Sequence, residues 1–293
     1  MKLLAPQYMA GFKCIAQRCR RSCCKGWEID IDEESLERFK KLGIGAISEE
    51  GTPHFILKEG DVCPHLRDDG LCSLIICYSE DVLCDICRDH PRFRNFWTGF
   101  AEVGLGLACE EAARIILSGK EPIRLTVLGD CDENGVLSDP APVKAEPSLG
   151  LPEEDEGPET GGPAAGILRD RKAEDVGESI DALIERLPED EARLYELREN
   201  MLAGAADIPD PMQARLAEYL IFRHLADALY DGRLRGRIGF INRAFKTVTG
   251  LWERSEDKSF ETLCELAGIW SEKTEYNEEL KDSLIEEFER TEE

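Results

Sequence analysis

A dense group of cysteines near the start of the chain constrains its fold more than any other feature. Four thiols lie within eleven residues, at Cys14, Cys19, Cys23 and Cys24. Arginines and lysines stand between and beside them. Neighbouring positive charge lowers the pKa of a thiol and offsets the negative charge that builds up when several thiolates share one metal. This density favours a shared metal or iron–sulfur centre over ordinary packed thiols.

The chain has 293 residues and twelve cysteines. That length allows one large domain or two modest ones, each with its own core. No apolar signal segment precedes the first cysteines, so we expect a cytoplasmic protein whose cysteines bind metal rather than form disulfides. No apolar run approaches the roughly 18 residues that a membrane span requires.

The net charge of −25 is unevenly distributed. Residues 121–293 carry 20 Lys+Arg against 42 Asp+Glu. An acidic surface repels phosphate backbones and anionic lipid headgroups, which argues against nucleic acid and membrane as partners. It is compatible with a basic target such as lysine side chains, and equally with acidity that serves solubility alone.

A second group of cysteines follows the first. Cys63 and Cys72 flank an Asp-Gly turn at Gly70, which predicts a hairpin that presents both thiols together. Cys77, Cys84 and Cys87 fall on a stretch that we expect to be helical. Cys109 stands just before a predicted helix, where the helix dipole favours a thiolate. Two further cysteines stand alone and are interpreted as structural, Cys131 and Cys264.

The predicted fold class is α+β and mainly α-helical. Residues 1–128 are expected to form a cysteine-rich metal-binding domain with short strands, one of them at Ile123–Leu128. Residues 129–168 are rich in Pro, Gly, Asp and Glu and predict a linker. Residues 169–293 show apolar side chains at helical spacing and predict an acidic helical domain.

Cysteine spacing does not identify the metal. The pattern Cys14-x4-Cys19-x3-Cys23-Cys24 is not that of a zinc finger, and Gly26 occupies the place of the third cysteine in a radical-enzyme triplet. Zinc and iron–sulfur clusters both accept four sulfur ligands. Both therefore stay open, and His90 is a further ligand type nearby.

Several motifs together resemble the flagellin lysine-N-methylase family. They are Met1-Lys-Leu-Leu-Ala-Pro-Gln-Tyr8-Met-Ala-Gly-Phe-Lys-Cys14, Cys23-Cys24-Lys-Gly-Trp27, Cys63-Pro-His-Leu, Gly70-Leu-Cys72, Cys87 leading to His90-Pro-Arg92, Cys109-Glu-Glu-Ala-Ala-Arg114, Tyr219–Arg235, and Trp270-Ser-Glu-Lys-Thr-Glu275-Tyr-Asn277.

The resemblance implies methyl transfer from S-adenosylmethionine to lysine side chains of flagellin, with a 4Fe-4S cluster at the centre. By that comparison the recurring cysteines, and hence the expected metal ligands, are Cys14, Cys19, Cys23, Cys24, Cys63, Cys72, Cys87 and Cys109. Cys77 and Cys84 are less regular in the family.

The sequence indicates less about the cofactor and the reacting groups. Arg92 and Arg94 are candidate clamps for the carboxylate of S-adenosylmethionine. If one iron of a cluster lacked a cysteine ligand, it would offer a position for the amino and carboxylate groups of that cofactor. No residue stands out as the base that lysine methylation needs, so catalytic residues stay unassigned. The alternative is a non-enzymatic cysteine-cluster protein that chelates zinc or iron.

Overall fold

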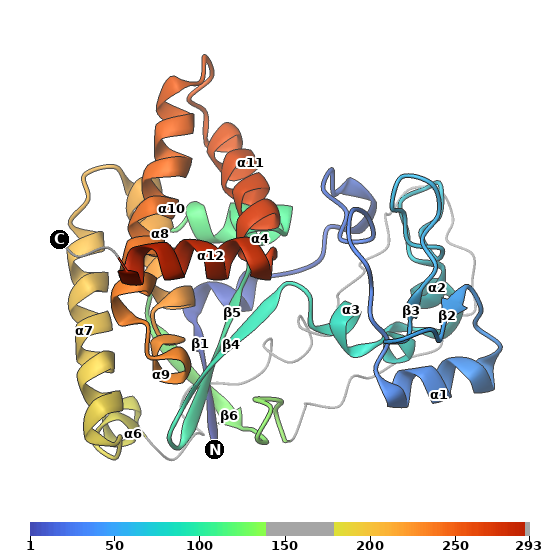
Figure 1. Ribbon diagram of the computed structural model, residues 1–293, viewed down its shortest axis with the longest axis horizontal. Coiled ribbons are helices and arrows are strands. Elements are labelled where there is room, and N and C mark those ends of the chain that lie inside the picture. The colour runs from blue at the N-terminus through green and yellow to red at the C-terminus, as the bar shows by residue number, and fades with distance from the viewer. Residues whose placement is uncertain (139–178, 291–293) are drawn as a thin grey trace. The chain divides into compact units, whose positions relative to one another are not determined.

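The structure is a computed structural model that describes residues 1–138 and 179–290, and these form two compact units (Figure 1). The sheet unit contains Met1–Phe12 and the described parts of Pro91–Pro142 and Leu168–Glu293. The described part of the thiol unit is Lys13–His90. The chain therefore leaves the sheet unit after Phe12 and returns to it at Pro91.

The sheet unit is built on a four-stranded sheet in the order β4-β5-β1-β6. Its strands are β1 (Lys2–Pro6), β4 (Arg92–Trp97), β5 (Phe100–Leu105) and β6 (Leu125–Asp130). β1 and β5 run parallel, while β4 and β6 are antiparallel to their neighbours. The carboxyl ends of β1 and β5 thus meet at one edge of the sheet.

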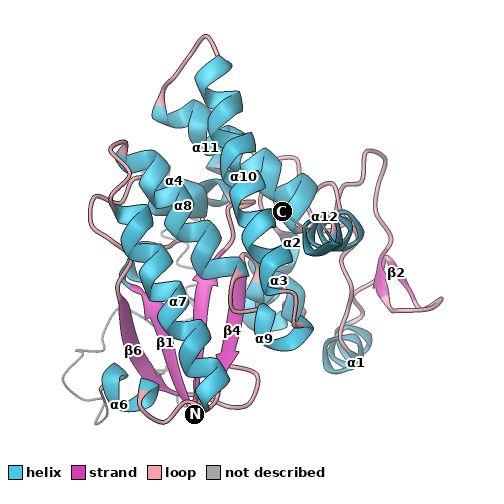
Figure 2. Ribbon diagram, turned by 60° about the vertical axis from the view of Figure 1, so that its left-hand side comes forward, coloured by secondary structure: helices cyan, strands magenta, loops and turns pink. Residues whose placement is uncertain are grey.

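Every residue of the inner strand β5 is buried. A buried polar side chain costs free energy unless it has a hydrogen-bond or ion-pair partner. Glu102 on β5 forms an ion pair with Arg198 at 2.6 Å, and both are at most 1% exposed. Asn95 Nδ2 on β4 donates to the Phe222 carbonyl at 2.8 Å. Arg198 lies on α7 (Glu189–Ala206) and Phe222 on α8 (Pro211–His224), so these two helices cover that face of the sheet, as Figure 2 shows.

The remaining helices of the sheet unit pack around α8. α10 lies against α8 and α12, and α11 lies against α4. A π-helical turn, Ser271–Glu275, joins α11 to α12. The bounds are α4 Glu110–Leu117, α6 Ile180–Ile184, α9 Ala228–Asp231, α10 Leu234–Arg254, α11 Phe260–Trp270 and α12 Glu278–Arg290.

The thiol unit has short elements around a small apolar core. Phe39 and Phe55 stack at its centre, with ring centroids 5.6 Å apart, and both are at most 1% exposed. Cys63 and Cys84 belong to the same buried cluster. Its elements are α1 Glu33–Leu42, α2 Ser73–Tyr78, α3 Asp85–Asp89, β2 Ile47–Ser48 and β3 His54–Phe55.

The mixed α+β class is confirmed, with about half of the described residues in helices. The hairpin around Gly70 is confirmed, because Leu66 and Cys72 form an antiparallel bridge and Gly70 has a φ of +80°. The expectation of one helical stretch from Cys77 to Cys87 was wrong. Ser79 has a φ of +73°, which ends α2, and Cys84 lies outside α3 as its N-cap.

The division of the chain also differs from the predicted one at residues 128 and 169. The terminal strand β1 pairs with β5 and β6, which follow the thiol-rich segment, so sequence neighbours fall into different units. The predicted linker at 129–168 begins inside β6, and residues 131–138 continue with a bridge between Cys131 and Leu137. Positions 139–168 of that linker lie outside the described residues. No described helix is both long and apolar enough to cross a membrane.

Candidate functional site

Nine of the twelve cysteines lie in the thiol unit, and three, Cys109, Cys131 and Cys264, lie in the sheet unit. All twelve fall within the described residues and are free thiols. The structure therefore supports reduced cysteines as the starting point for any metal chemistry.

Six thiols of the thiol unit interact with one another, and we call them the thiol group: Cys23, Cys24, Cys63, Cys72, Cys84 and Cys87. Cys24 is hydrogen-bonded to both Cys23 and Cys63. Cys87 is hydrogen-bonded to Cys84 and interacts electrostatically with Cys23 and Cys24. Cys72 interacts electrostatically with Cys63 and Cys84.

These contacts keep most of the thiol group protonated. The hydrogen bond to Cys23, reinforced by burial, raises the pKa of Cys24 to about 12. The hydrogen bond to Cys24, with burial, raises the pKa of Cys63 well above its usual value. Crowded thiolates would repel each other, and protonation removes that cost, as a bound cation also would. Thiols placed in this way are candidate metal ligands.

Two backbone pairings bring the two cysteine segments together. The Cys63 N–H donates to the Cys24 carbonyl at 2.9 Å, and the Gly26 N–H donates to the Asp61 carbonyl at 2.9 Å. Gly26 has a φ of +86°, a conformation that glycine adopts without strain. The segment after Cys23-Cys24 thus runs antiparallel to the segment before Cys63.

Asp32 holds the third cysteine segment in place. One of its carboxylate oxygens accepts from the Ser35 N–H at 2.8 Å and caps α1, while the other accepts from the Asp85 N–H at 2.9 Å. Burial alone would raise the pKa of Asp32, but these backbone donors outweigh it and lower the pKa. A single carboxylate thus joins α1 to the turn that carries Cys84.

The thiol group differs in membership from the predicted ligand set. It includes Cys84, which the family comparison left doubtful and which is 1% exposed. The spacing Cys84-x-x-Cys87 was the signal that could have identified it. Among the other predicted ligands, Cys14 is exposed and accepts from the Ala16 N–H at 3.4 Å, Cys19 ends a 3-10 turn, and Cys109 stands at the N-cap position of α4 in the sheet unit.

Sulfur is a ligand that zinc and iron–sulfur clusters both accept. The positions of the thiols, however, are not those of ligands around one metal. Within the described part of the chain, no three His, Cys, Asp or Glu side chains are arranged as around a metal ion. A metal that bound here would have to draw the thiols closer together. Metal binding here stays a prediction.

The two arginines predicted as carboxylate clamps lie two residues apart on β4. The Arg92 guanidinium lies over the Phe12 ring, 5.9 Å from its centroid. Arg94 Nε donates to the Gly135 carbonyl at 3.2 Å. These contacts are within the sheet unit and give both side chains a structural role, and cofactor binding by either one stays a prediction.

A buried polar network that sequence reasoning missed lies at the carboxyl ends of β1 and β5. Glu275 is 2% exposed and accepts from Tyr219 Oη at 3.0 Å and from His224 Nε2 at 2.7 Å. Burial would raise the pKa of Glu275, but Arg223 and His224 lower it to about 2. The Leu107 N–H, just after β5, lies 3.3 Å from Tyr219 Oη. Helical spacing on α8 predicts only apolar contacts, but the family motifs Tyr219–Arg235 and Trp270–Asn277 contain these residues and were the signal that could have identified the network.

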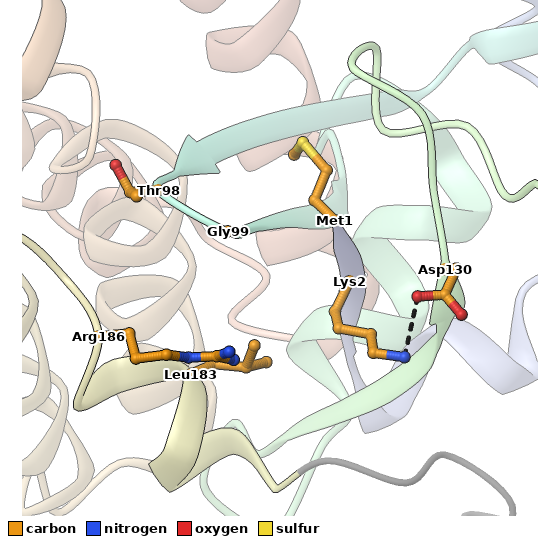
Figure 3. Close-up of a pocket in the computed structure, with 7 residues that line it drawn as sticks. All are labelled: Met1, Lys2, Thr98, Gly99, Asp130, Leu183 and Arg186. Atoms are coloured by element: carbon orange, nitrogen blue, oxygen red, sulfur yellow. Dashed lines mark ion pairs between the residues drawn. The ribbon is translucent and has the colours of Figure 1, made fainter.

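The sheet unit also has a pocket of about 320 Å³ at the opposite edge of the sheet, where β1 and β5 begin (Figure 3). The Lys2 ammonium forms an ion pair with Asp130 at 2.9 Å on its wall. None of the predicted site residues lines it. The lining residues are Met1, Lys2, Thr98, Gly99, Asp130, Leu183 and Arg186.

Comparison with known proteins finds several that are similar to this chain in sequence. It is 27% identical over 135 residues to a lysine-N-methylase of Salmonella choleraesuis and 26% identical over 135 residues to a lysine-N-methylase of Salmonella typhimurium. The chain is thus similar in sequence to lysine-N-methylases over part of its length. The resemblance found in the sequence motifs is thereby confirmed.

The relationship is distant and partial. Each alignment covers 41% of this chain and 34% of the methylase, so the similarity spans about a third of those relatives. The flagellar biosynthetic protein FliU of Salmonella muenchen is 26% identical over 136 residues, which cover 41% of this chain and 79% of FliU. No family model and no solved structure matches the chain.

Proposed function

We propose that this protein is a lysine N-methyltransferase that moves a methyl group from S-adenosylmethionine to lysine side chains of flagellin. The observation that carries this proposal is the sequence similarity to the two Salmonella lysine-N-methylases. The name of the third relative, a flagellar biosynthetic protein, supports a flagellar substrate.

The proposed reaction sets two requirements. The lysine nitrogen attacks the sulfonium methyl group, the carbon–sulfur bond breaks with its electrons left on sulfur, and the methylated nitrogen releases a proton. The attacking amine must be neutral, although its ordinary pKa is about 10.4. Glu275 is a poor proton acceptor because its pKa is lowered to about 2. Desolvation of the substrate amine is the simpler way to lower its pKa.

We assign the metal to the thiol group. A 4Fe-4S cluster or a zinc ion takes four sulfur ligands, and five members of the group lie in or against the apolar core: Cys24, Cys63, Cys72, Cys84 and Cys87. When bound, the metal supplies positive charge that keeps these sulfurs as thiolates. Asp32 and the Cys24–Cys63 backbone pairing hold the ligands in place.

A second candidate function is a non-enzymatic metal-binding protein of flagellar assembly. The relative FliU favours it, because its name describes flagellar biosynthesis without an enzymatic activity and the alignment covers 79% of it. The thiol group would serve either function.

Methyl transfer can be tested with S-adenosylmethionine labelled in its methyl group and purified flagellin. We expect label in flagellin lysines, located by mass spectrometry, and none when the lysines are acetylated beforehand. Anaerobically purified protein that carries its metal and transfers no label would contradict the methylase and leave the metal-binding alternative.

A further inference from the structure

Two thiols of the thiol unit, Cys84 and Cys87, lie within one helical turn. Cys84 is the N-cap residue of α3, and Cys87 is the third residue of that helix. The Arg88 N–H donates to the Cys84 carbonyl at 2.9 Å and closes the turn that contains both cysteines. Side chains at the N-cap and at the third helical position face each other, as they do in a capping box. The backbone of one short segment therefore places the two sulfurs side by side.

The contacts of the two sulfurs agree with this placement. The Cys84 sulfur accepts from the Cys87 N–H and from the Cys87 thiol. Residues three apart in a helical turn have Cα atoms about 5 Å apart. Disulfides join cysteines whose Cα atoms are about 4.4 to 6.8 Å apart. A disulfide between Cys84 and Cys87 thus requires rotation of side chains rather than movement of the backbone.

The two cysteines differ in how easily a reagent can reach them. Cys84 is 1% exposed and belongs to the apolar core, whereas Cys87 is partly exposed. Thiol–disulfide exchange begins at a sulfur that the reagent can approach. Cys87 is therefore the thiol at which exchange starts, and Cys84 is the thiol that completes it from inside the protein.

A second pair of neighbouring thiols, Cys24 and Cys63, competes with this one. The Cys63 N–H donates to the Cys24 carbonyl, so these residues face each other across an antiparallel pairing of two segments. Their proximity depends on contacts between distant parts of the chain and is lost when the unit opens locally. Only two residues separate Cys84 from Cys87, so their sulfurs stay close during such an opening, because a short loop costs little entropy to close. We therefore expect the Cys84–Cys87 pair to react first.

We propose that Cys84 and Cys87 are a redox-active dithiol that a small disulfide, such as oxidised glutathione, converts reversibly to a protein disulfide. The Cys87 sulfur attacks one sulfur of the small disulfide, whose S–S bond breaks and releases one small thiol. The Cys84 sulfur then attacks the Cys87 sulfur of this mixed disulfide, and the second small thiol leaves. Two electrons and two protons pass from the pair to the small disulfide.

The disulfide would make metal binding depend on redox conditions. It removes two sulfurs from the thiol group, so a metal bound by these sulfurs should be released. This consequence rests on the metal assignment made under the proposed function, whereas formation of the disulfide does not.

The test equilibrates anaerobically purified, reduced protein with a series of glutathione buffers, from fully reduced to fully oxidised. Free thiols are then alkylated, disulfides are mapped by mass spectrometry, and metal is measured in the same samples. We expect the Cys84–Cys87 disulfide to form before any other, to accompany metal loss, and to disappear when reduced glutathione is restored. A first disulfide between Cys24 and Cys63, or oxidation of the thiol group in no order, would overturn the proposal.

Single variants test the direction of the exchange. Cys84→Ser should stop at a mixed disulfide of Cys87 with one glutathione, at a level at least about tenfold above the parent, because the second thiol is missing. Cys87→Ser should leave Cys84 unmodified, because Cys84 is 1% exposed. Cys264→Ser, on α11 of the sheet unit, is the matched control and should oxidise as the parent does. Parent-like release of the second glutathione in Cys84→Ser would show that another cysteine completes the exchange, and the proposal would fail.

The redox pair, the metal assignment and the methylase can fail separately. Ordered oxidation of Cys84 and Cys87 in protein that contains no metal would retain the redox pair and reject the metal assignment. Protein that keeps its metal and its thiols in fully oxidised glutathione would retain the metal and reject the redox pair. Transfer of labelled methyl groups to flagellin by the reduced protein is measured independently of both.

Discussion

The two units satisfy their buried polar atoms in opposite ways. In the sheet unit, unlike charges meet: Glu102 faces Arg198, and Glu275 faces Arg223. In the thiol unit, like groups meet, because six thiols are one another's main polar neighbours. Opposite charges neutralise each other within the protein, whereas clustered thiolates need protons or a bound cation. The sheet unit therefore pairs its buried charges internally, and under the proposed function a metal would do the same for the thiol unit.

Metal removal should give the largest difference between the units. Anaerobically purified protein is expected to be brown with about four irons per chain. A chelator should then cost the thiol unit most of its amide hydrogen-exchange protection, because its small core has only short elements to support it. The sheet unit should keep its protection. Hydrogen exchange read by mass spectrometry, peptide by peptide, measures both units in one sample.

Single cysteine variants sharpen the same test. Cys63→Ser and Cys84→Ser should lose most of the metal, while Cys264→Ser, on α11 of the sheet unit, should lose none. Equal loss at Cys264, or full metal content in Cys84→Ser, would disprove the thiol group as the ligand set. Colourless protein with stoichiometric zinc would reject the cluster and retain the ligands.

Breaking the buried ion pair of the sheet unit should have the next largest effect. Glu102→Gln leaves Arg198 charged, 1% exposed and without its anion, which costs about 3–5 kcal/mol of unfolding free energy. The double variant with Arg198→Met should recover much of that loss, because no unpaired charge remains. Urea unfolding measures both. Arg193→Ala, whose exposed pair with Glu189 contributes at most about 0.5 kcal/mol, is the control.

The sequence predicted the local pieces of the molecule better than their assembly. The hairpin around Gly70 and the N-cap position of Cys109 follow from turn residues and apolar spacing that act over a few residues. The division into units does not, because β1 pairs with β5 across almost a hundred residues. The ion pair between Glu102 and Arg198 is equally distant in sequence, so neither residue showed its partner.

Replacing Asp32 should destabilise the thiol unit by a smaller amount and at one defined contact. Asp32→Ala removes the acceptor for two backbone donors, from Ser35 and Asp85, and should cost about 1–2 kcal/mol. Because the folded pKa of Asp32 is lowered, its contribution is fully present above the unfolded pKa of about 3.9 and is lost as the pH falls through the folded value. The parent and variant stabilities should therefore converge at low pH.

Asp210→Ala is the matched control, since Asp210 caps α8 in the sheet unit through the Met212 and Gln213 N–H groups. Both variants lose a helix cap, yet only Asp32→Ala should reduce metal content, because Asp32 also holds the Asp85 N–H next to Cys84 and Asp210 contacts no cysteine segment. Similar metal loss in both variants would mean that general destabilisation, rather than the position of Cys84, controls metal binding.

The smallest expected effect concerns the acidity of the C-terminal part of the chain. Residues 121–293 carry 42 Asp+Glu against 20 Lys+Arg, and this excess can speed the encounter with a lysine-bearing protein surface. Replacing two exposed acids of α12, Glu278 and Glu279, with glutamine should lower kcat/KM for flagellin about twofold at low salt. Near physiological ionic strength the Debye length is roughly 8 Å, so the difference between parent and variant should largely disappear there.

A control for this test removes positive charge instead of negative charge, on helix α10. Arg243 and Lys246 are exposed on that helix, and replacing both with glutamine removes positive charge from the same unit. If electrostatic attraction assists the encounter, this variant should be slightly faster than the parent at low salt and equal to it at high salt. S-adenosylhomocysteine affinity should stay constant in both variants, because it depends on short-range contacts. Rates that do not respond to salt or to either pair of substitutions would show that the acidity serves solubility alone.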